Sequence, residues 1–201
     1  QPATLEAGYD RAAQILTAGK YPIIYGLSDS PCEAQRVAVS IVDWINGTID
    51  TTTSVCHGPS GMAFQGVGEV TCSLGEVANR GDLIMFWGSN PAESHPRHFT
   101  KYSLMPKGMF LPNGRKDRTC VIVDVRRTKS AKAADIFIQI KPRADFEALW
   151  ALRALAKGVD LDPKIVLRDT GIELSVWQDL MARMKAAKFG VIFFGMGVTM
   201  T

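Results

Sequence analysis

Hydrophobic positions follow two alternating patterns along the chain, namely short apolar runs and segments with helical periodicity. The apolar runs predict strands at Pro22–Gly26, Asp82–Gly88, Thr119–Val125, Asp135–Lys141 and Val191–Phe194. Helical periodicity covers about Leu5–Ala18, Ser30 to Asn46-Gly47, Cys72–Arg80, Asp145–Lys157 and Ser175–Ala187. Strands that alternate with helices predict an α/β fold, here a Rossmann-like three-layer domain with a mostly parallel sheet.

Local signals predict where helices begin and where loops lie. The run SPCE, Ser30–Glu33, has the pattern of a capping box with Pro31 at the first helical position. Ser73 and Glu76 open the helix that ends at Arg80. The glycine-rich stretch Gly58–Gly68 predicts a loop with one short helix at most. Residues 107–118 predict a second loop, which leaves the regular pattern of strands and helices.

The ends of the chain bear on its domain organisation. It opens on Gln1 and closes on VIFFGMGVTMT, an apolar strand followed by a glycine turn. We therefore expect a fragment of a larger multidomain subunit. Residues 1–201 are expected to form one central Rossmann-like region. The alternative is two lobes, about 1–80 plus 185–201, and 81–160.

Composition narrows the function classes. The 201 residues carry 23 Lys+Arg against 20 Asp+Glu, a net charge of +3 that is too small and too mixed for a nucleic-acid binder. The longest apolar runs, such as Leu83–Trp87, are too short to insert in a membrane. The four scattered cysteines include no CxxC pair, which excludes a local zinc ribbon and fits a cytoplasmic protein.

The strongest candidates for catalytic or metal-binding residues are Cys56 and His57, inside VCHGPSG. A cysteine before a helix start can ionise, because helix N–H groups and a neighbouring imidazolium favour the thiolate. A thiolate attacks carbon or binds soft metals, and a histidine can move a proton near pH 7. The alternative is that Cys56 is a small buried hydrophobe and His57 is held by a carbonyl.

Polar residues also follow two predicted strands. Gly88, Ser89 and Asn90 come directly after one, where ligands of parallel sheets bind, so they are candidates for holding a phosphate or nucleotide. The spacing matches neither GxGxxG nor a P-loop, so neither NAD nor ATP is favoured. The alternative is a tight Asn-Pro turn before a helix.

Asp124 ends the strand that precedes a basic loop. Its carboxylate could accept hydrogen bonds from a ribose or from guanine, with Arg127 or Thr128 near a phosphate. The alternative is a solvated loop held by Asp124 as a helix cap. His95 and His98 follow Glu93, but Pro96 between them disfavours a helical metal pair, and the methionines are expected to fill core gaps.

Taken in order, the motifs resemble those of one family. VCHGPSG, WGSNPAESHP and IVDVRRTKSAKAADIFIQIKPRADFEAL are similar to segments of the molybdopterin-guanine-dinucleotide oxidoreductases, the formate dehydrogenase superfamily. CHGPS, SLGEVANRGD, SNPAESHPRHFTKYS and GRKDRT resemble in particular the branch formed by B subunits of formylmethanofuran dehydrogenases. The resemblance covers nearly the whole chain.

The resemblance implies roles for individual residues. Cys56 matches the cysteine that ligates molybdenum or tungsten, and His57 matches the adjacent histidine that assists proton movement. Positions that contact the pterin-guanine dinucleotide are implied for eight residues: Gly88, Ser89, Asn90, Glu93, Asp124, Arg126, Thr128 and Asp145. Two motifs depart from the family, because Val125 replaces the proline of D-P-R, and Arg143-Ala144 replace Gly-Thr in P-G-T-D.

The resemblance also implies cofactors, partners and a reaction. Two molybdopterin guanine dinucleotides would hold one Mo or W, and an iron–sulfur cluster would lie in an N-terminal region outside these residues. The reaction is reversible two-electron reduction of CO2 to formate, on the route to formylmethanofuran in methanogenesis. Partner subunits would carry electron-transferring iron–sulfur clusters and condense the formyl group, and we expect the fragment to be inactive alone. The alternatives are a formate dehydrogenase, or a metal-free scaffold subunit of a formyltransferase/hydrolase complex.

Overall fold

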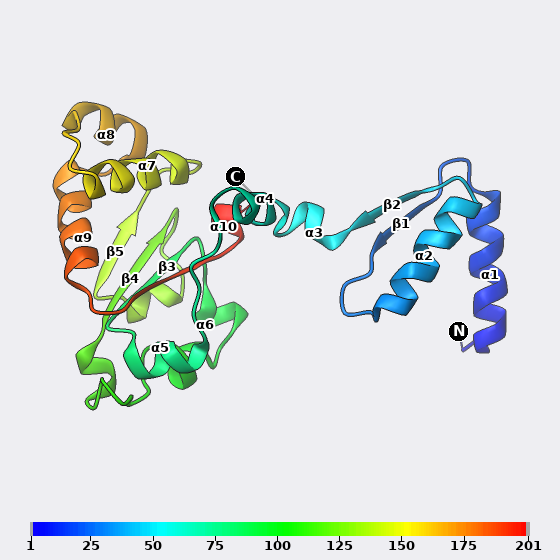
Figure 1. The fold of residues 1–201 in the computed structure, drawn as a ribbon, viewed down its shortest axis with the longest axis horizontal. Coiled ribbons are helices and arrows are strands. Elements are labelled where there is room, and N and C mark those ends of the chain that lie inside the picture. Colours follow the sequence, from blue (N-terminus) through cyan, green and yellow to red (C-terminus); the bar gives the residue numbers. More distant parts are fainter. Residues whose placement is uncertain (1, 200–201) are drawn as a thin grey trace. The chain divides into compact units, whose positions relative to one another are not determined.

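The computed structural model describes residues 2–199, which divide into two compact units (Figure 1). One unit ends at Met62 and the other begins at Ala63. This division differs from the expected lobes, which joined residues 185–201 to the N-terminal part. The physical reason is that the last strand pairs with the central strand of the second unit. The predicted α/β class with parallel sheets is confirmed.

The first unit is built on a two-stranded parallel sheet, in which Ile23 lies opposite Thr48. Its elements are α1 (Leu5–Ala18), β1 (Ile23–Gly26), α2 (Cys32–Trp44), β2 (Thr48–Thr51), α3 (Thr52–Val55) and the first half of α4 (Gly58–Val67). The sequence pattern missed β2, because TIDT is short and mostly polar. In the helices of this unit only Ala38 and Val42 are fully buried, so its core is small.

The predicted capping box before α2 is wrong. Pro31 occupies the N-cap position and makes no side-chain cap hydrogen bond. The Ser30 hydroxyl instead donates to the Leu27 carbonyl at 2.6 Å, within the turn that precedes the helix. The second predicted box is confirmed, because Ser73 accepts from the Glu76 N–H and the Glu76 carboxylate accepts from the Ser73 N–H.

The second unit contains a four-stranded parallel sheet in the order β5-β4-β3-β6. The strands are β3 (Leu83–Trp87), β4 (Thr119–Asp124), β5 (Ile136–Gln139) and β6 (Gly190–Phe194). The longer helices are α5 (Leu74–Arg80), α7 (Asp145–Ala156), α8 (Pro163–Thr170) and α9 (Leu174–Ala186). The short ones are α6 (Pro91–Ser94), η1 (Phe99–Ser103), η2 (Gly114–Asp117), η3 (Ser130–Ala133) and α10 (Met196–Thr199).

Alternate residues of the central strand face opposite sides of the sheet, as the strand period requires. Met85 and Trp87 join a core with Trp177 and other residues of α7, α8 and α9. Ile84 and Phe86 join the second core with Val77 of α5 and Leu104. Every residue of β3 is buried, which is typical of a parallel strand covered on both faces and confirms the three-layer arrangement.

The weaker helical signals were missed. Helix α8 lies between two predicted helices without a prediction of its own, and α10 occupies the expected glycine turn. The Gly58–Gly68 stretch, where we expect a loop with one short helix at most, forms the ten-residue helix α4, although three of its helical residues are glycine. Over residues 2–199, no helix combines the length and the apolar character that crossing a membrane needs.

In the second unit, the buried side chain of Arg118 lies against the carboxyl end of α5. Arg118 is 4% exposed, and its guanidinium donates to the carbonyls of Val77, Ala78 and Gly81 at 2.6–3.0 Å and to that of Pro106 at 3.0 Å. Burial lowers its pKa, and Asp117 opposes that change. The carboxyl end of a helix carries partial negative charge, so the carbonyl groups at that end of α5 balance the positive charge of the buried guanidinium.

Replacing Arg118 by Met should destabilise the fold by about 3 kcal/mol, because four carbonyls lose a charged donor. Urea unfolding of Arg118→Met measures the change. The matched control is Arg183→Met, which removes only an exposed ion pair with Asp179 and should cost less than about 1 kcal/mol. Equal losses in the two variants would contradict the role given to Arg118.

Candidate functional site

In the first unit, Cys56 and His57 occupy the break between α3 and α4, shortly after the carboxyl end of β2. The Cys56 N–H donates to the Thr53 carbonyl at 3.1 Å, which ends α3. The His57 carbonyl accepts from the Gly61 N–H at 2.9 Å, which begins the next helical turn. The thiol is half-buried and the imidazole is exposed, so both groups can meet a ligand.

The four cysteines are all free, but their surroundings differ. Burial raises the pKa of Cys120 to about 12, so this thiol stays protonated at neutral pH. Burial, with the Glu76 carboxylate, also raises the pKa of Cys72. Cys32 is exposed at the start of α2. Cys56 has a partly accessible thiol, and it lies in the break between α3 and α4 that follows a parallel strand.

No group of three or more His, Cys, Asp or Glu side chains in residues 2–199 could hold a metal ion by itself. A metal at Cys56 would therefore need most of its ligands from another source. This requirement fits a metal that is held mainly by the sulfur atoms of an organic cofactor, because such a metal needs only one soft ligand from the protein.

In the second unit, the candidate residues gather at the carboxyl edge of the sheet. Gly88, Ser89 and Asn90 follow β3, and residues 124–128 lie at the end of β4 and beyond it. Asp145 begins α7, after β5. Because all four strands run parallel, these segments end at one edge of the sheet, where α/β proteins bind ligands.

Asn90 and Ser130 join the two loops after β3 and β4. The Ser130 hydroxyl donates to Asn90 Oδ1 at 2.7 Å and accepts from the Ala92 N–H at 3.0 Å. The Ser130 N–H also donates to Asn90 Oδ1, at 3.3 Å. Ser130 is completely buried, so these bonds are not exchanged with water.

Glu93 also connects these loops. It accepts from the amide of Asn90 and pairs with Lys129, whose Nζ lies 3.2 Å from its Oε1. The hydrogen bond and charge of Lys129 hold the pKa of this exposed carboxyl below its usual value. Asn90 and Glu93 were expected to contact a nucleotide, but their side chains bond to protein groups instead. These two side chains therefore help to shape the loop.

Gly88 has a structural reason to be glycine. Its φ is +55°, and a Cβ there would lie 3.0 Å from the Cα of Gly197. Its N–H already donates to the Val123 carbonyl at 2.9 Å. A Cβ on Gly195 would lie only 2.5 Å from the Gly88 carbonyl oxygen. The glycines therefore allow the loop after β6 to pack directly against the loop after β3.

Asp145 is buried and accepts from the indole Nε1 of Trp87 at 2.7 Å. This bond ties the start of α7 to the end of β3. Two residues earlier, Arg143 has a φ of +67°, a conformation that glycine adopts far more easily. The position is the one where the resembled P-G-T-D motif has glycine.

The remaining predicted residues differ in accessibility. Thr128 is 7% exposed, and its Oγ1 makes no hydrogen bond within residues 2–199. Asp124 is half-buried, with Oδ1 accepting from the Arg126 N–H at 3.3 Å. The Arg126 side chain is exposed and Ser89 is half-buried. Asp124, Arg126 and Ser89 are thus partly or fully accessible at the edge, and Thr128 has an unused polar atom.

Sequence reasoning missed the residues that hold the edge together, Ser130, Lys129, Trp87, Gly195 and Gly197. The two glycines follow a predicted strand, which was a signal for close packing. Ser130 gave no such signal, because its partner lies 40 positions away in the chain.

The parallel sheet and the loops at its carboxyl edge define a Rossmann-like α/β protein. No family model matches the chain. Among solved structures, acetylene hydratase from Pelobacter acetylenicus aligns with a TM-score of 0.67 and 13% identity, covering 99% of this chain and 30% of that one. The formyltransferase/hydrolase complex from Methylorubrum extorquens aligns with a TM-score of 0.66 and 20% identity, over 98% of this chain and 52% of that one. These two likenesses show the fold alone.

Sequence relatives give the narrower identification. The chain is 44% identical over 196 residues to the B subunit of tungsten-containing formylmethanofuran dehydrogenase 2 from Methanocaldococcus jannaschii. It is 42% identical over 196 residues to the protein of that name in Methanococcus maripaludis. Each match covers 98% of this chain and 44% of the relative. Formate dehydrogenase H of Escherichia coli is 24% identical over 193 residues, covering 82% of the chain and 25% of that protein.

The predicted resemblance to B subunits of formylmethanofuran dehydrogenases is confirmed over almost the whole chain. The chain spans less than half the length of these two relatives.

Replacing Ser130 by Ala should lower the free energy of unfolding by about 2 kcal/mol, because Asn90 Oδ1 and the Ala92 N–H lose a buried partner. Urea unfolding measures the change. Ser94→Ala, at the end of α6, is the matched control, since that hydroxyl is exposed, and its loss should cost less than about 0.5 kcal/mol. If Ser130→Ala leaves the free energy of unfolding unchanged, other contacts must hold the two loops together.

Replacing Arg143 by Gly should stabilise the fold by about 0.5–1 kcal/mol, because the left-handed conformation no longer strains a side chain. Arg143→Ala controls for loss of the side chain, since alanine keeps the strain and should give no gain. Thermal or urea unfolding compares the three proteins. Destabilisation by glycine, or equal gains from both variants, would count against a strained turn at this position.

Proposed function

We propose that the chain is part of the catalytic subunit of a tungsten or molybdenum formylmethanofuran dehydrogenase. The observation that carries the proposal is Cys56-His57, a half-buried thiol beside an exposed imidazole, in a chain 44% identical to the B subunit of a tungsten-containing enzyme. A soft metal can be ligated by the thiolate form of Cys56. An imidazole next to it can carry protons at neutral pH.

The residues present fit a cofactor that brings most of the metal's ligands. Molybdopterin guanine dinucleotide, two per metal, would supply dithiolene sulfurs and make two-electron chemistry available. Cys56 would contribute the single protein sulfur, in agreement with the lack of a multi-residue metal cluster within residues 2–199. Cys120 is not suited to this role, because its pKa is raised to about 12.

A guanosine group would bind at the carboxyl edge of the second unit. We assign the Asp124 carboxylate to the guanine amidine edge or the ribose, because it is a half-buried acceptor at the end of a strand. Ser89, and the Arg126 side chain, are placed to bind phosphate oxygens. The buried, unpaired Thr128 hydroxyl supports a polar ligand beside it.

Asn90, Glu93, Gly88 and Asp145 would support the cofactor by shaping this edge. Their side chains or backbone are already bonded to Ser130, Lys129, Val123 and Trp87. A loop that is bonded before binding loses little freedom on binding, which favours affinity. We therefore separate residues that contact the dinucleotide from residues that position it.

The proposed reaction joins CO2, two electrons and one proton to give formate, and it is reversible. His57 would accept or donate the proton, and Cys56 would hold the metal. A partner subunit would then condense formate with methanofuran, releasing water, to give formylmethanofuran. The electrons would come from iron–sulfur clusters in an N-terminal region and in another subunit. The four free cysteines are in keeping with a cytoplasmic enzyme.

A formate dehydrogenase with another electron donor is the second candidate. The formate dehydrogenases that match are less similar to this chain, at 24% and 29% identity, against 44% and 42% for the B subunits. A metal-free scaffold is the third, favoured by the likeness to the formyltransferase/hydrolase complex, but that likeness at 20% identity concerns the fold. The Cys-His pair favours the redox enzyme.

Replacing Cys56 by Ala in the complete enzyme should lower CO2 and formate turnover at least 100-fold, because the metal loses its protein ligand. Activity assays with methanofuran, together with metal analysis, measure the outcome. Cys32→Ala is the control, since that thiol is exposed on α2 and should leave turnover unchanged. Full activity in Cys56→Ala, or a complex without tungsten, molybdenum or guanine, would exclude the proposed role.

A further inference from the structure

A cavity of about 260 Å³ lies at the amino ends of β3 and β6, at the edge of the sheet opposite the candidate nucleotide edge. It is lined by side chains from the end of α5, the turn before η2 and the segment between α9 and β6: Arg80, Asp82, Phe110, Leu111, Lys188 and Phe189. Its size is below the roughly 300–1,000 Å³ of sites for drug-sized ligands, so it suits a group the size of one side chain.

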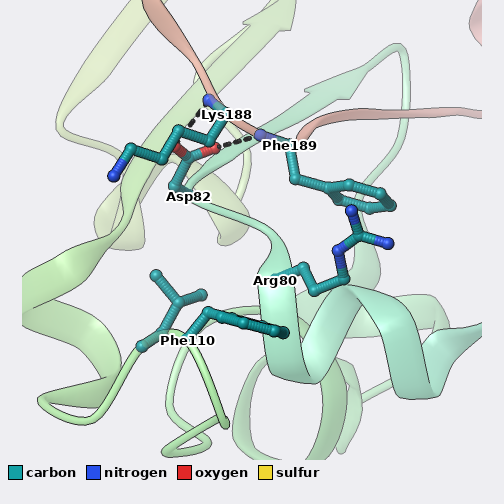
Figure 2. Close-up of a pocket in the computed structure, with 6 residues that line it drawn as sticks. Arg80, Asp82, Phe110, Lys188 and Phe189 are labelled. Carbon is teal, nitrogen blue, oxygen red and sulfur yellow. Dashed lines mark hydrogen bonds between the residues drawn. The ribbon is translucent and has the colours of Figure 1, made fainter.

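The polar part of the cavity is cationic. Asp82 accepts the N–H of Lys188 at 2.8 Å and that of Phe189 at 2.9 Å, so both of its oxygens are occupied (Figure 2). Arg80 and Lys188 form no ion pair within residues 2–199. Two positive side chains and one negative side chain leave a net positive charge that favours an anion.

The apolar part consists of the Phe110 and Phe189 rings and Leu111. The Arg80 guanidinium lies 4.5 Å from the centre of the Phe189 ring, and Figure 2 shows the two close together with Phe110 apart from them. Phe110 is 66% exposed, a large apolar surface left in contact with water. An apolar group against the Phe110 ring would remove this surface from water.

The backbone turn that carries Phe110 is held in place before any ligand binds. The Phe110 N–H donates to the Asn79 carbonyl at 3.1 Å, and the Met109 N–H donates to Asn79 Oδ1 at 3.0 Å. A Cβ on Gly108 would lie 2.3 Å from the Ala78 carbonyl, so this turn rests directly on the end of α5. Rigid walls reduce the entropy lost on binding.

We propose that this cavity binds a carboxylate carried on an apolar group, with the carboxylate on Arg80 and the apolar part against Phe110. Lys188, on the other side of Asp82, adds positive potential. An aromatic or aliphatic carboxylic acid meets this description, and so does an acidic side chain of another subunit with an apolar neighbour. The planar guanidinium of Arg80 can donate two parallel hydrogen bonds to a carboxylate.

Saturation-transfer NMR with phenylacetate and its neutral analogue phenylacetamide tests the proposal on the full-length chain. Phenylacetate should bind at least tenfold more tightly than the amide, because only the acid pairs with Arg80. Arg80→Gln and Lys188→Gln should each weaken phenylacetate binding, the former about tenfold. Lys185→Gln removes an equal charge from α9 outside the cavity and should change nothing. No binding, equal binding of acid and amide, or an equal loss in Lys185→Gln overturns the proposal.

The same NMR measurement on the assembled complex distinguishes the two sources of the carboxylate, which are a free carboxylic acid and an acidic side chain of another subunit. If the phenylacetate signal disappears on assembly and Arg80→Gln weakens assembly, the natural ligand is an acidic side chain of another subunit. If the signal persists in the complex, the ligand is a free carboxylic acid. If the signal disappears while Arg80→Gln leaves assembly unchanged, the cavity is simply covered and the proposal fails.

Discussion

The parallel pairing of β3 with both of its neighbours is the constraint on which the second unit depends. Leu83 lies opposite Thr119 of β4 and Gly190 of β6, so the three strands begin together and their ends reach one edge. That strand is buried on both faces, and burial of its five side chains is a large favourable contribution to folding. Polar loops from distant parts of the sequence therefore meet beyond Trp87.

Much of the polarity at that edge serves to hold loops in place. Ser130 joins two loops, Asp145 satisfies the indole of Trp87, and Lys129 balances Glu93. The bonds of Ser130 and Asp145 pair polar groups that burial would otherwise leave unsatisfied, whereas the ion pair between Lys129 and Glu93 is exposed. The accessible groups, Asp124, Ser89 and Arg126, are then the ones available to a ligand.

The sequence pattern predicted the strong elements well, for physical reasons. The five predicted strands and helices such as Asp145–Lys157 are confirmed because their apolar spacing reflects burial in the two cores. The short polar strand β2 was missed, and the glycine-rich α4 was expected as one short helix at most, because local propensity opposes both elements. The capping box predicted at Ser30 does not form, because the Ser30 hydroxyl donates its hydrogen bond to the Leu27 carbonyl in the preceding turn.

The candidate site could be predicted only in outline. Order along the chain indicated which residues follow strands, and the parallel sheet then places residues 88–90, 124–128 and 145 at one edge. It could not show that Asn90 bonds to Ser130, because pairing over 40 positions depends on tertiary structure. It also could not distinguish Cys56 from Cys120 by burial, which the fold decides.

The central claim is that Cys56 is the protein ligand of the metal. Selenocysteine placed at position 56 of the complete enzyme tests it directly, because selenium scatters X-rays much more strongly than sulfur. X-ray absorption at the tungsten or molybdenum edge should then show one selenium in the first coordination shell, absent when selenocysteine replaces Cys32 instead. A metal spectrum with no selenium neighbour at position 56 would contradict the account.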